Sequence, residues 1–270
     1  MDIELVVIDL DGTLVKSDLS VGERTIAAVE RARKIGVEIT FATGRMVSAS
    51  KKYAEILSIN LPMIALNGAI VQQHNNGSPI FHRKIEENIF LKILPIIKDS
   101  SGAVTIVFGD DAFGWNIDDF TKKRLSSWIV DIKEISPREI SAEPTIVMVA
   151  GEEKSVRETA EKIFALEIAN LEAFLFPSIR YYPMWYMEIR AGGVDKGLGV
   201  RALRKNLGLK KEKILVIGDY LNDLPMFAES GISAAVSNAH EDVINAADYV
   251  SPLSCDQDAV ADILENVVLG

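Results

Sequence analysis

A short apolar segment, IELVVI at residues 3–8, constrains the fold more than any other part of the sequence. Its apolar residues follow one another instead of alternating with polar ones, which is typical of a strand buried on both faces of a parallel sheet. A helical pattern, TIAAVERARKI, and a second apolar segment at 37–42 come next. Because a strand, a helix and a strand with short connections form a right-handed crossover, the two strands are predicted to be parallel.

The predicted helix between these strands has recognisable ends. Ser20 and Glu23 form the S-x-x-E pattern of a capping box, which predicts the start of the helix. Gly36 stands where a left-handed residue commonly ends a helix.

The crossover rhythm continues through residues 47–67 and returns after Gly192. Residues 69–84 have the pattern of a hairpin with a turn at Asn76 and Gly77. Between about 85 and 185, helical and extended patterns alternate differently, and the aromatic RYYPMWYMEIR is predicted to be a strand.

The sequence therefore predicts an α/β fold, a doubly wound parallel sheet interrupted by an inserted α+β domain. The boundaries expected from the change in pattern are 1–84 for the first part of the core, 85–187 for the insert and 188–270 for the second part of the core.

Charge and composition exclude several classes of protein. The net charge of −10 and the pI near 4.9 argue against a nucleic-acid surface, which needs clustered Lys and Arg. A phosphate ligand would thus need a local cation or a metal. The single cysteine, Cys255, allows no intrachain disulfide. No segment approaches the ~20 apolar residues of a membrane span, and the acidic N-terminus does not resemble a signal peptide, so the expected location is the cytoplasm.

Polar residues follow the predicted strands where ligands usually bind in open parallel sheets, at the carboxyl ends of the strands. The stretches concerned are DLDGT (9–13), ATGR (42–45), NGA (67–69) and GDYLND (218–223).

Two carboxylates, Asp9 and Asp11, stand only two positions apart in the first of these stretches, and Asp219 and Asp223 add negative charge from another. Like charges this close require a cation or a shared proton, so the pattern predicts a divalent metal or a strongly split pair of pKa values. The histidines show no ligand spacing, which favours an oxygen-ligated ion such as Mg2+.

Two other motif interpretations fail. The EF-hand pattern counted from Asp9 requires glycine and glutamate where the chain has Leu14 and Ser20. The stretch GGVDKGLG lacks the order of a phosphate-binding P-loop.

Four stretches taken in order, DLDGTL, ATGR, GVDKG and GDYLND, resemble the motifs of the haloacid dehalogenase (HAD) superfamily, and specifically its Cof-type (IIB) phosphatase branch. The resemblance covers essentially the whole chain, and the insert looks like the α+β cap of that family. Two departures are Tyr220, where a small residue is common, and Ala259, where glycine is usual.

The resemblance implies a role for each aspartate. Asp9 would be the nucleophile that forms an aspartyl-phosphate beside Mg2+. Asp11 would protonate the leaving group and then activate water, while its main-chain carbonyl ligates the metal. Asp219 would be a metal ligand. Asp223 would support the metal or hold Lys196, and capping the following helix explains it equally well.

The resemblance also implies the phosphate contacts. Thr43 and the Gly44 amide would bind a phosphoryl oxygen at the start of a helix, where free N–H groups favour an anion. Lys196 would supply the local cation. The remaining residues expected at the phosphate or substrate are Leu10, Arg45 and Asn222.

The predicted function is thus a Mg2+-dependent phosphatase for small phosphorylated metabolites, with sugar phosphates as the family's commonest substrates and no nucleic-acid or membrane partner. A phosphomutase or phosphotransferase would use the same residues. A phosphoaspartate switch resembling a response-regulator receiver is disfavoured by the length of the chain, and an inactive binding module is disfavoured because no expected catalytic group is missing.

Overall fold

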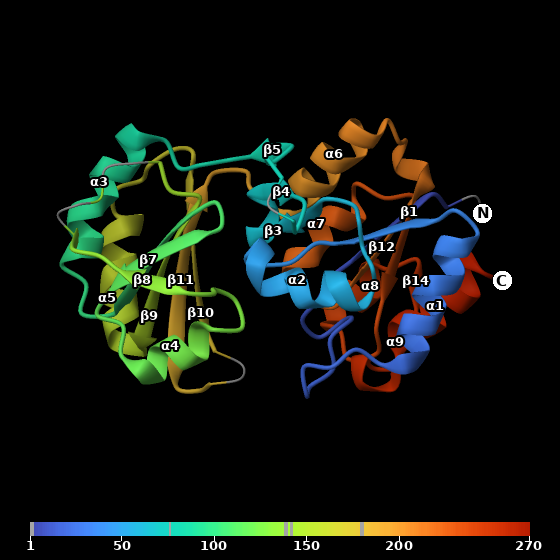
Figure 1. Ribbon diagram of the computed structural model, residues 1–270. Coiled ribbons are helices and arrows are strands. Elements are labelled where there is room, and N and C mark those ends of the chain that lie inside the picture. Colours follow the sequence, from blue (N-terminus) through green and yellow to red (C-terminus); the bar gives the residue numbers. More distant parts are fainter. Residues whose placement is uncertain (1–2, 76, 138–139, 141–142, 179–180) are drawn as a thin grey trace. The chain divides into compact units, whose positions relative to one another are not determined.

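The computed structural model describes residues 3–75, 77–137, 140, 143–178 and 181–270 (Figure 1). The chain forms two compact units, a core unit of Met1–Phe81 with Asp195–Gly270 and an inserted unit of His82–Val194. The sequence pattern placed these junctions after residues 84 and 187, and the two compact units meet after residues 81 and 194.

The core unit is built on a five-stranded parallel sheet with the strand order β14-β13-β12-β1-β2. Its strands are β1 (Leu5–Ile8), β2 (Glu38–Phe41), β12 (Ile214–Gly218), β13 (Ile232–Ala235) and β14 (Tyr249–Val250). In the centre of the sheet, Val7 pairs with Thr40 on one side and Val216 on the other. All four residues of β1 are buried, which is why its apolar residues follow one another.

A smaller sheet extends from the β2 edge, with the order β3-β4-β5. Its strands are β3 (Met63–Ala65), β4 (Ile70–Gln72) and β5 (Phe81–His82). A parallel bridge between Ala42 and Ile64 joins β3 to the end of β2. Strands β4 and β5 correspond to the predicted hairpin, while Asn76 of its expected turn lies outside the described residues.

Helices cover both faces of the parallel sheet. Leu5 and Val7 pack against α6 and α7 in one apolar cluster. Helix α1 contacts β2 and also α9, and Figure 1 shows α1 and α9 together on the side away from α6. The helices of the core unit are α1 (Glu23–Lys34), α2 (Val47–Ile56), α6 (Lys196–Leu207), α7 (Leu224–Phe227), α8 (Glu241–Ala246) and α9 (Ala259–Ile263). The predicted doubly wound α/β fold is confirmed.

The start of α1 differs from the prediction. Its N-cap is Gly22, without a side-chain cap, and the Ser20 hydroxyl donates to Asp18 instead. Gly22 lies so close to Asp258 that an added Cβ would stand 1.6 Å from the Asp258 Oδ1 atom. The expected capping box is therefore wrong. The predicted end is confirmed, because Gly36 has a φ of +92° just beyond the helix.

The inserted unit contains a six-stranded sheet with the order β10-β11-β9-β6-β7-β8. Helices α3 and α5 contact each other and lie side by side in Figure 1. They share an apolar cluster with the sheet that includes Phe90 and Val149. The strands are β6 (Ala103–Phe108), β7 (Asp111–Trp115), β8 (Ile132–Glu134), β9 (Ile146–Glu152), β10 (Leu171–Pro177) and β11 (Met184–Ala191); the helices are α3 (Glu87–Lys98), α4 (Asp119–Leu125) and α5 (Glu153–Phe164).

Two further findings concern the helices and the single cysteine. Within the described part of the chain, none of the helices has both the length and the apolar character that crossing a membrane requires. Cys255 is buried as a free thiol.

Candidate active site

The predicted strand ends meet at one edge of the parallel sheet. Asp9 follows β1, Asp219 follows β12, and Thr43 lies two residues beyond β2. The Asp9 amide still donates to the Ile217 carbonyl at 2.9 Å, so the first aspartate is fixed by the sheet itself. Because neighbouring parallel strands end at the same edge, residues far apart in the chain converge there.

Three carboxylates form the centre of the site. Asp9, Asp219 and Asp223 each offer an oxygen atom, and these atoms lie within 4.8 Å of one another. Asp9 is 4% exposed and Asp223 is fully buried. Charges of one sign cannot stay this close in a buried place without compensation.

Lys196 provides part of that compensation. It is the first residue of α6, is 2% exposed, and donates from Nζ to Asp9 Oδ1 and to Asp223 Oδ1, each at 2.5 Å. The Asp195 side chain caps the helix by accepting from the Leu198 amide. Burial lowers the pKa of Lys196, but the two carboxylates outweigh it and leave the pKa raised. The lysine is therefore a fixed cation.

One lysine does not neutralise three carboxylates, and the pKa values show the excess charge. Burial raises the pKa of Asp9 well above its usual range, and the neighbouring carboxylates add to this against the opposing effect of Lys196. Burial and the Asp223 carboxylate raise the pKa of Asp219 to about 7. A hard divalent cation bound by these oxygens would relieve this repulsion, so the donor set fits Mg2+ or a similar ion.

The raised pKa of Asp219 predicts how the stability of the metal-free protein depends on pH. The folded state favours the protonated carboxyl, so the contribution is present below the unfolded pKa of 3.8 and is lost as the pH rises towards 7. Between pH 5 and pH 8 we expect the free energy of unfolding to fall by roughly 3 kcal/mol more in the wild type than in Asp219→Asn. Urea unfolding without divalent cations measures this difference, and parallel pH profiles for the two proteins would contradict it.

The Asp223 side chain makes its hydrogen bonds within the site and does not cap α7. Its Oδ2 atom accepts from the amides of Asp219 and Tyr220 at 2.9 and 3.0 Å, while its Oδ1 atom accepts from Lys196. Of the roles expected for this residue, the contact with Lys196 is therefore present. The same carboxylate also holds the loop that carries Asp219.

Gly12, Thr13 and Asn238 support the acidic cluster, and none of them was among the predicted site residues. The Thr13 hydroxyl donates to Asp219 Oδ1 at 2.9 Å, and Asn238 donates to the Gly12 carbonyl at 2.8 Å. Gly12 has a φ of +86°, and an added Cβ would stand 2.4 Å from an Asp219 oxygen. Thr13 lies inside the quoted DLDGT stretch, so its hydroxyl was visible in the sequence, whereas nothing local pointed to Asn238.

Thr43 and Gly44 lie in a loop, not at the start of a helix. Helix α2 begins at Val47 with Met46 as its N-cap, so the expected helix N-terminus at Thr43 is wrong. The Thr43 hydroxyl, fully buried, accepts from the Arg45 amide at 3.1 Å. The loop itself is therefore what orients these two residues.

Asn67 connects two of the other predicted phosphate contacts. It has a φ of +52°, its side chain accepts from Asn222 Nδ2 at 3.1 Å, and a Cβ on Gly44 would stand 3.3 Å from it. The sequence placed Asn67 at a strand end without a role. Leu10 is fully buried, and its expected contact with a phosphate stays a prediction.

Asp11 and Arg45 form a separate pair. Arg45 donates from Nε to Asp11 Oδ2 at 2.7 Å and from Nη2 to Asp11 Oδ1 at 2.5 Å. The Asp11 side chain is not one of the three clustered carboxylates, and the expected contact of its backbone carbonyl with a metal stays a prediction. Arg45 was expected at the phosphate or substrate, and in this structure its guanidinium is on the carboxylate of Asp11.

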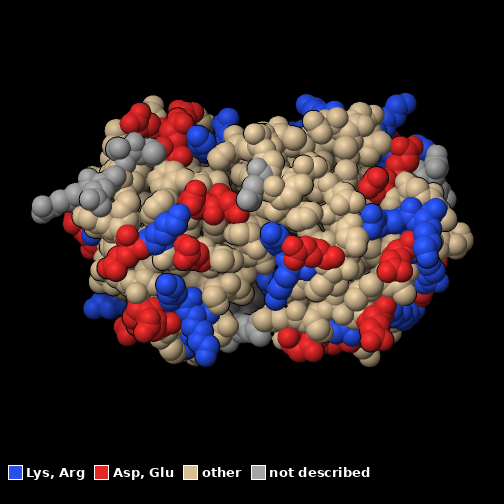
Figure 2. All heavy atoms as spheres, in the orientation of Figure 1, with Lys and Arg blue, Asp and Glu red and all other residues tan. Residues whose placement is uncertain are grey.

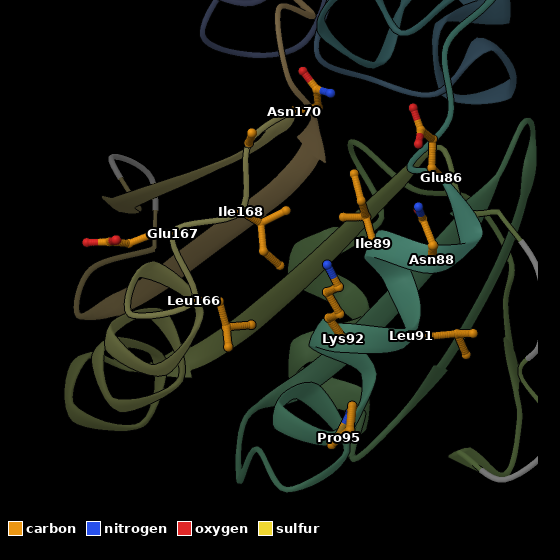
Figure 3. A pocket seen from close by; sticks show the side chains of 11 residues that line it. Glu86, Asn88, Ile89, Leu91, Lys92, Pro95, Leu166, Glu167, Ile168 and Asn170 are labelled. Atoms are coloured by element: carbon orange, nitrogen blue, oxygen red, sulfur yellow. The ribbon is translucent and has the colours of Figure 1, made fainter.

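A hollow lies in the inserted unit, between α3 and the segment 166–170 (Figure 3). Its volume is about 680 Å³, and Ile89, Lys92 and Ile168 point towards it. Its lining combines apolar residues with exposed polar ones and includes none of the clustered aspartates. The acidic cluster of the core unit therefore remains the candidate active site.

Known proteins match this chain over almost its whole length. Haloacid dehalogenase-like hydrolases as a family match residues 6–264. The chain belongs to this hydrolase family.

Individual relatives agree with this membership. The 5-amino-6-(5-phospho-D-ribitylamino)uracil phosphatase YitU of Bacillus subtilis is 24% identical over 269 residues, which cover 97% of this chain and 96% of that protein. The crystal structure of TM0651 from Thermotoga maritima has a TM-score of 0.84 at 28% identity and covers 98% of this chain and 97% of its own. The HAD subclass IIB sugar phosphatase BT4131 has a TM-score of 0.78 at 24% identity, over 97% of this chain and 98% of its own.

These comparisons confirm the predicted Cof-type HAD family and the predicted enzyme class, a phosphoric monoester hydrolase. A divalent metal is consistent with both the family and the carboxylate cluster.

Proposed function

We propose that the protein is a Mg2+-dependent phosphatase that hydrolyses small phosphorylated metabolites, sugar phosphates among them, through an aspartyl-phosphate intermediate. The observation that carries this proposal is the buried Asp9 carboxylate, joined to Lys196 at 2.5 Å and clustered with Asp219 and Asp223 at the carboxyl edge of the sheet. This arrangement combines a nucleophile, a fixed cation and a set of oxygen ligands in one place.

The residues that would hold the metal are Asp9, Asp219 and the main-chain carbonyl of Asp11, with Asp223 beside them. When bound, Mg2+ would neutralise charge on the transferring phosphoryl group. A hard cation suits this set, because carboxylate and carbonyl oxygens are its preferred ligands.

The reaction has two steps in this proposal. A carboxylate oxygen of Asp9 attacks phosphorus, the ester P–O bond breaks, and Asp11 gives its proton to the departing alkoxide. Water then loses a proton to Asp11 and attacks the same phosphorus, which breaks the Asp9–phosphorus bond and releases inorganic phosphate. Asp9 and Asp11 return to their starting forms.

Stabilisation of the phosphoryl group falls to residues around Asp9. Lys196 is a cation that does not need to reorganise during the reaction. The Thr43 hydroxyl, the Gly44 amide and the Asn222 side chain are expected to donate to phosphoryl oxygens. We also propose that the backbone at Leu10 contributes here.

The names of similar proteins support the choice of substrate. YitU is named for a phosphate ester on a ribityl chain, and BT4131 is described as a sugar phosphatase. Both names point to phosphate esters of sugar or sugar-alcohol chains, so we propose that class here. A nucleic-acid or membrane partner is not part of the proposal. On the face drawn in Figure 2, acidic and basic side chains of the described residues are interspersed. We also propose a cytoplasmic location.

Metal removal is the first test of this function. We expect phosphate release from a panel of phosphorylated metabolites to fall at least about 100-fold when EDTA removes divalent ions, because several kcal/mol of charge stabilisation is lost. Excess Mg2+ should restore the rate. Turnover that is unchanged after metal removal would refute the metal dependence.

The same panel separates hydrolysis from phosphoryl transfer. Adding a sugar acceptor at high concentration should leave inorganic phosphate as the main product. A phosphorylated acceptor in place of phosphate would favour the phosphotransferase alternative, and a long-lived phosphoprotein without turnover would favour a switch.

A further inference from the structure

The two residues of the Asp11–Arg45 ion pair differ strongly in how far their side chains are buried. Arg45 is only 2% exposed, whereas the side chain of Asp11 is 46% exposed. Two hydrogen bonds join the two parallel donors of the guanidinium to the two oxygens of the carboxylate. This bidentate geometry fixes the plane of the carboxylate, which a single contact would not do.

Arg45 also contacts Tyr53 and Thr43. Its guanidinium carbon lies 5.2 Å from the centroid of the Tyr53 ring, and Tyr53 is fully buried on α2. Its backbone amide donates to the Thr43 hydroxyl. Burial lowers the pKa of Arg45, but the Asp11 carboxylate outweighs this and leaves the pKa raised. Arg45 is therefore a rigid charged support for a more exposed acid.

From this geometry we infer that Arg45 is a positioning residue that acts through Asp11, and that it is not a direct phosphate ligand. The inference builds on the proposed function, in which Asp11 transfers the proton. Each carboxylate oxygen has two lone pairs, and the guanidinium uses one on each. The remaining lone pairs stay available for the proton that moves to the leaving group and returns from water.

Without this support, the exposed Asp11 side chain would be free to occupy several staggered rotamers. Proton transfer requires the donor oxygen within hydrogen-bond reach of the leaving oxygen. We therefore expect Arg45→Met to lower kcat/KM for an alkyl phosphate about 10- to 100-fold, the size expected when a reacting group is misplaced by about 1 Å.

A double-mutant cycle tests whether Arg45 acts through Asp11. The rates of wild type, Arg45→Met, Asp11→Asn and the double variant are compared with one alkyl phosphate. We expect Arg45→Met to change the rate of Asp11→Asn by less than about threefold, because the residue it positions no longer transfers a proton. Full additivity of the two losses would overturn the inference.

Two further measurements separate positioning from phosphate binding. Arg45→Met should reduce kcat/KM much less for p-nitrophenyl phosphate than for the alkyl phosphate, because the nitrophenolate leaves without a proton. The inhibition constant of inorganic phosphate should stay within about threefold of the wild-type value. An equal loss with both substrates, together with weaker inhibition by phosphate, would assign Arg45 to the phosphate instead.

Three controls keep the result interpretable. Arg45→Lys retains the charge with a single donor group, and it should recover part of the activity lost in Arg45→Met; if Arg45→Met does not fold, the cycle is run with the lysine variant. Arg31→Met removes an exposed arginine that pairs with Glu265 and should leave the rates unchanged. If the wild type releases no phosphate from any substrate, the proposed function fails, whereas additivity in an active enzyme contradicts only the inference about Arg45.

Discussion

Asp9→Asn is expected to lower phosphate release by at least about 10⁴-fold while leaving the protein folded, because an amide cannot attack phosphorus as a carboxylate does. The substitution keeps the shape of the side chain. It also removes one negative charge from the cluster with Asp219 and Asp223, so the metal-free variant should be at least as stable as the wild type.

The measurement combines initial rates of phosphate release with thermal unfolding of the same preparations. Asp18→Asn is the matched control, because Asp18 is an exposed aspartate whose side chain accepts from Ser20 and lies outside the cluster. It should retain wild-type activity. A variant at Asp9 with substantial turnover would show that another group is the nucleophile.

Lys196→Met is expected to combine a loss of activity with a loss of stability. The ammonium group lies between Asp9 and Asp223, so its removal leaves both carboxylates without their cation. We expect kcat to fall about 10³-fold, comparable to the removal of a preorganised oxyanion donor. Breaking a buried ion pair on one side destabilises proteins by roughly 3–5 kcal/mol, and we expect that range for the metal-free variant near neutral pH.

The stability effect has a second signature. Adding Mg2+ should recover part of the lost stability, since the metal would supply positive charge to the same carboxylates. Lys205→Met, at an exposed position in the last turn of the same helix, is the matched control and should change neither quantity. Wild-type kcat in Lys196→Met would mean that the metal alone compensates the phosphoryl charge.

Much of the core unit could be predicted because its signals are local. The run of apolar residues in β1 reflects burial between β2 and β12, and Gly36 ends α1 through its own backbone freedom. The convergence of strand ends follows from parallel topology. The contact of Lys196 with Asp9 spans 187 positions in the chain, so only the family resemblance indicated it.

The features that were mispredicted or missed depend on distant neighbours. Gly22 replaces the expected cap because Asp258 occupies the space beside it, and no pattern near residue 22 reveals that. Arg45 contacts Asp11 with Tyr53 packed behind it, and the motif indicated neither neighbour. A local sequence pattern can place a residue on a loop but cannot choose among the partners that the loop meets.

Every side chain proposed for the chemistry belongs to the core unit, to Met1–Phe81 or to Asp195–Gly270. The long segment between them contributes none of the reacting groups. Substitutions in the described residues of that segment would therefore leave every side chain proposed for bond breaking unchanged.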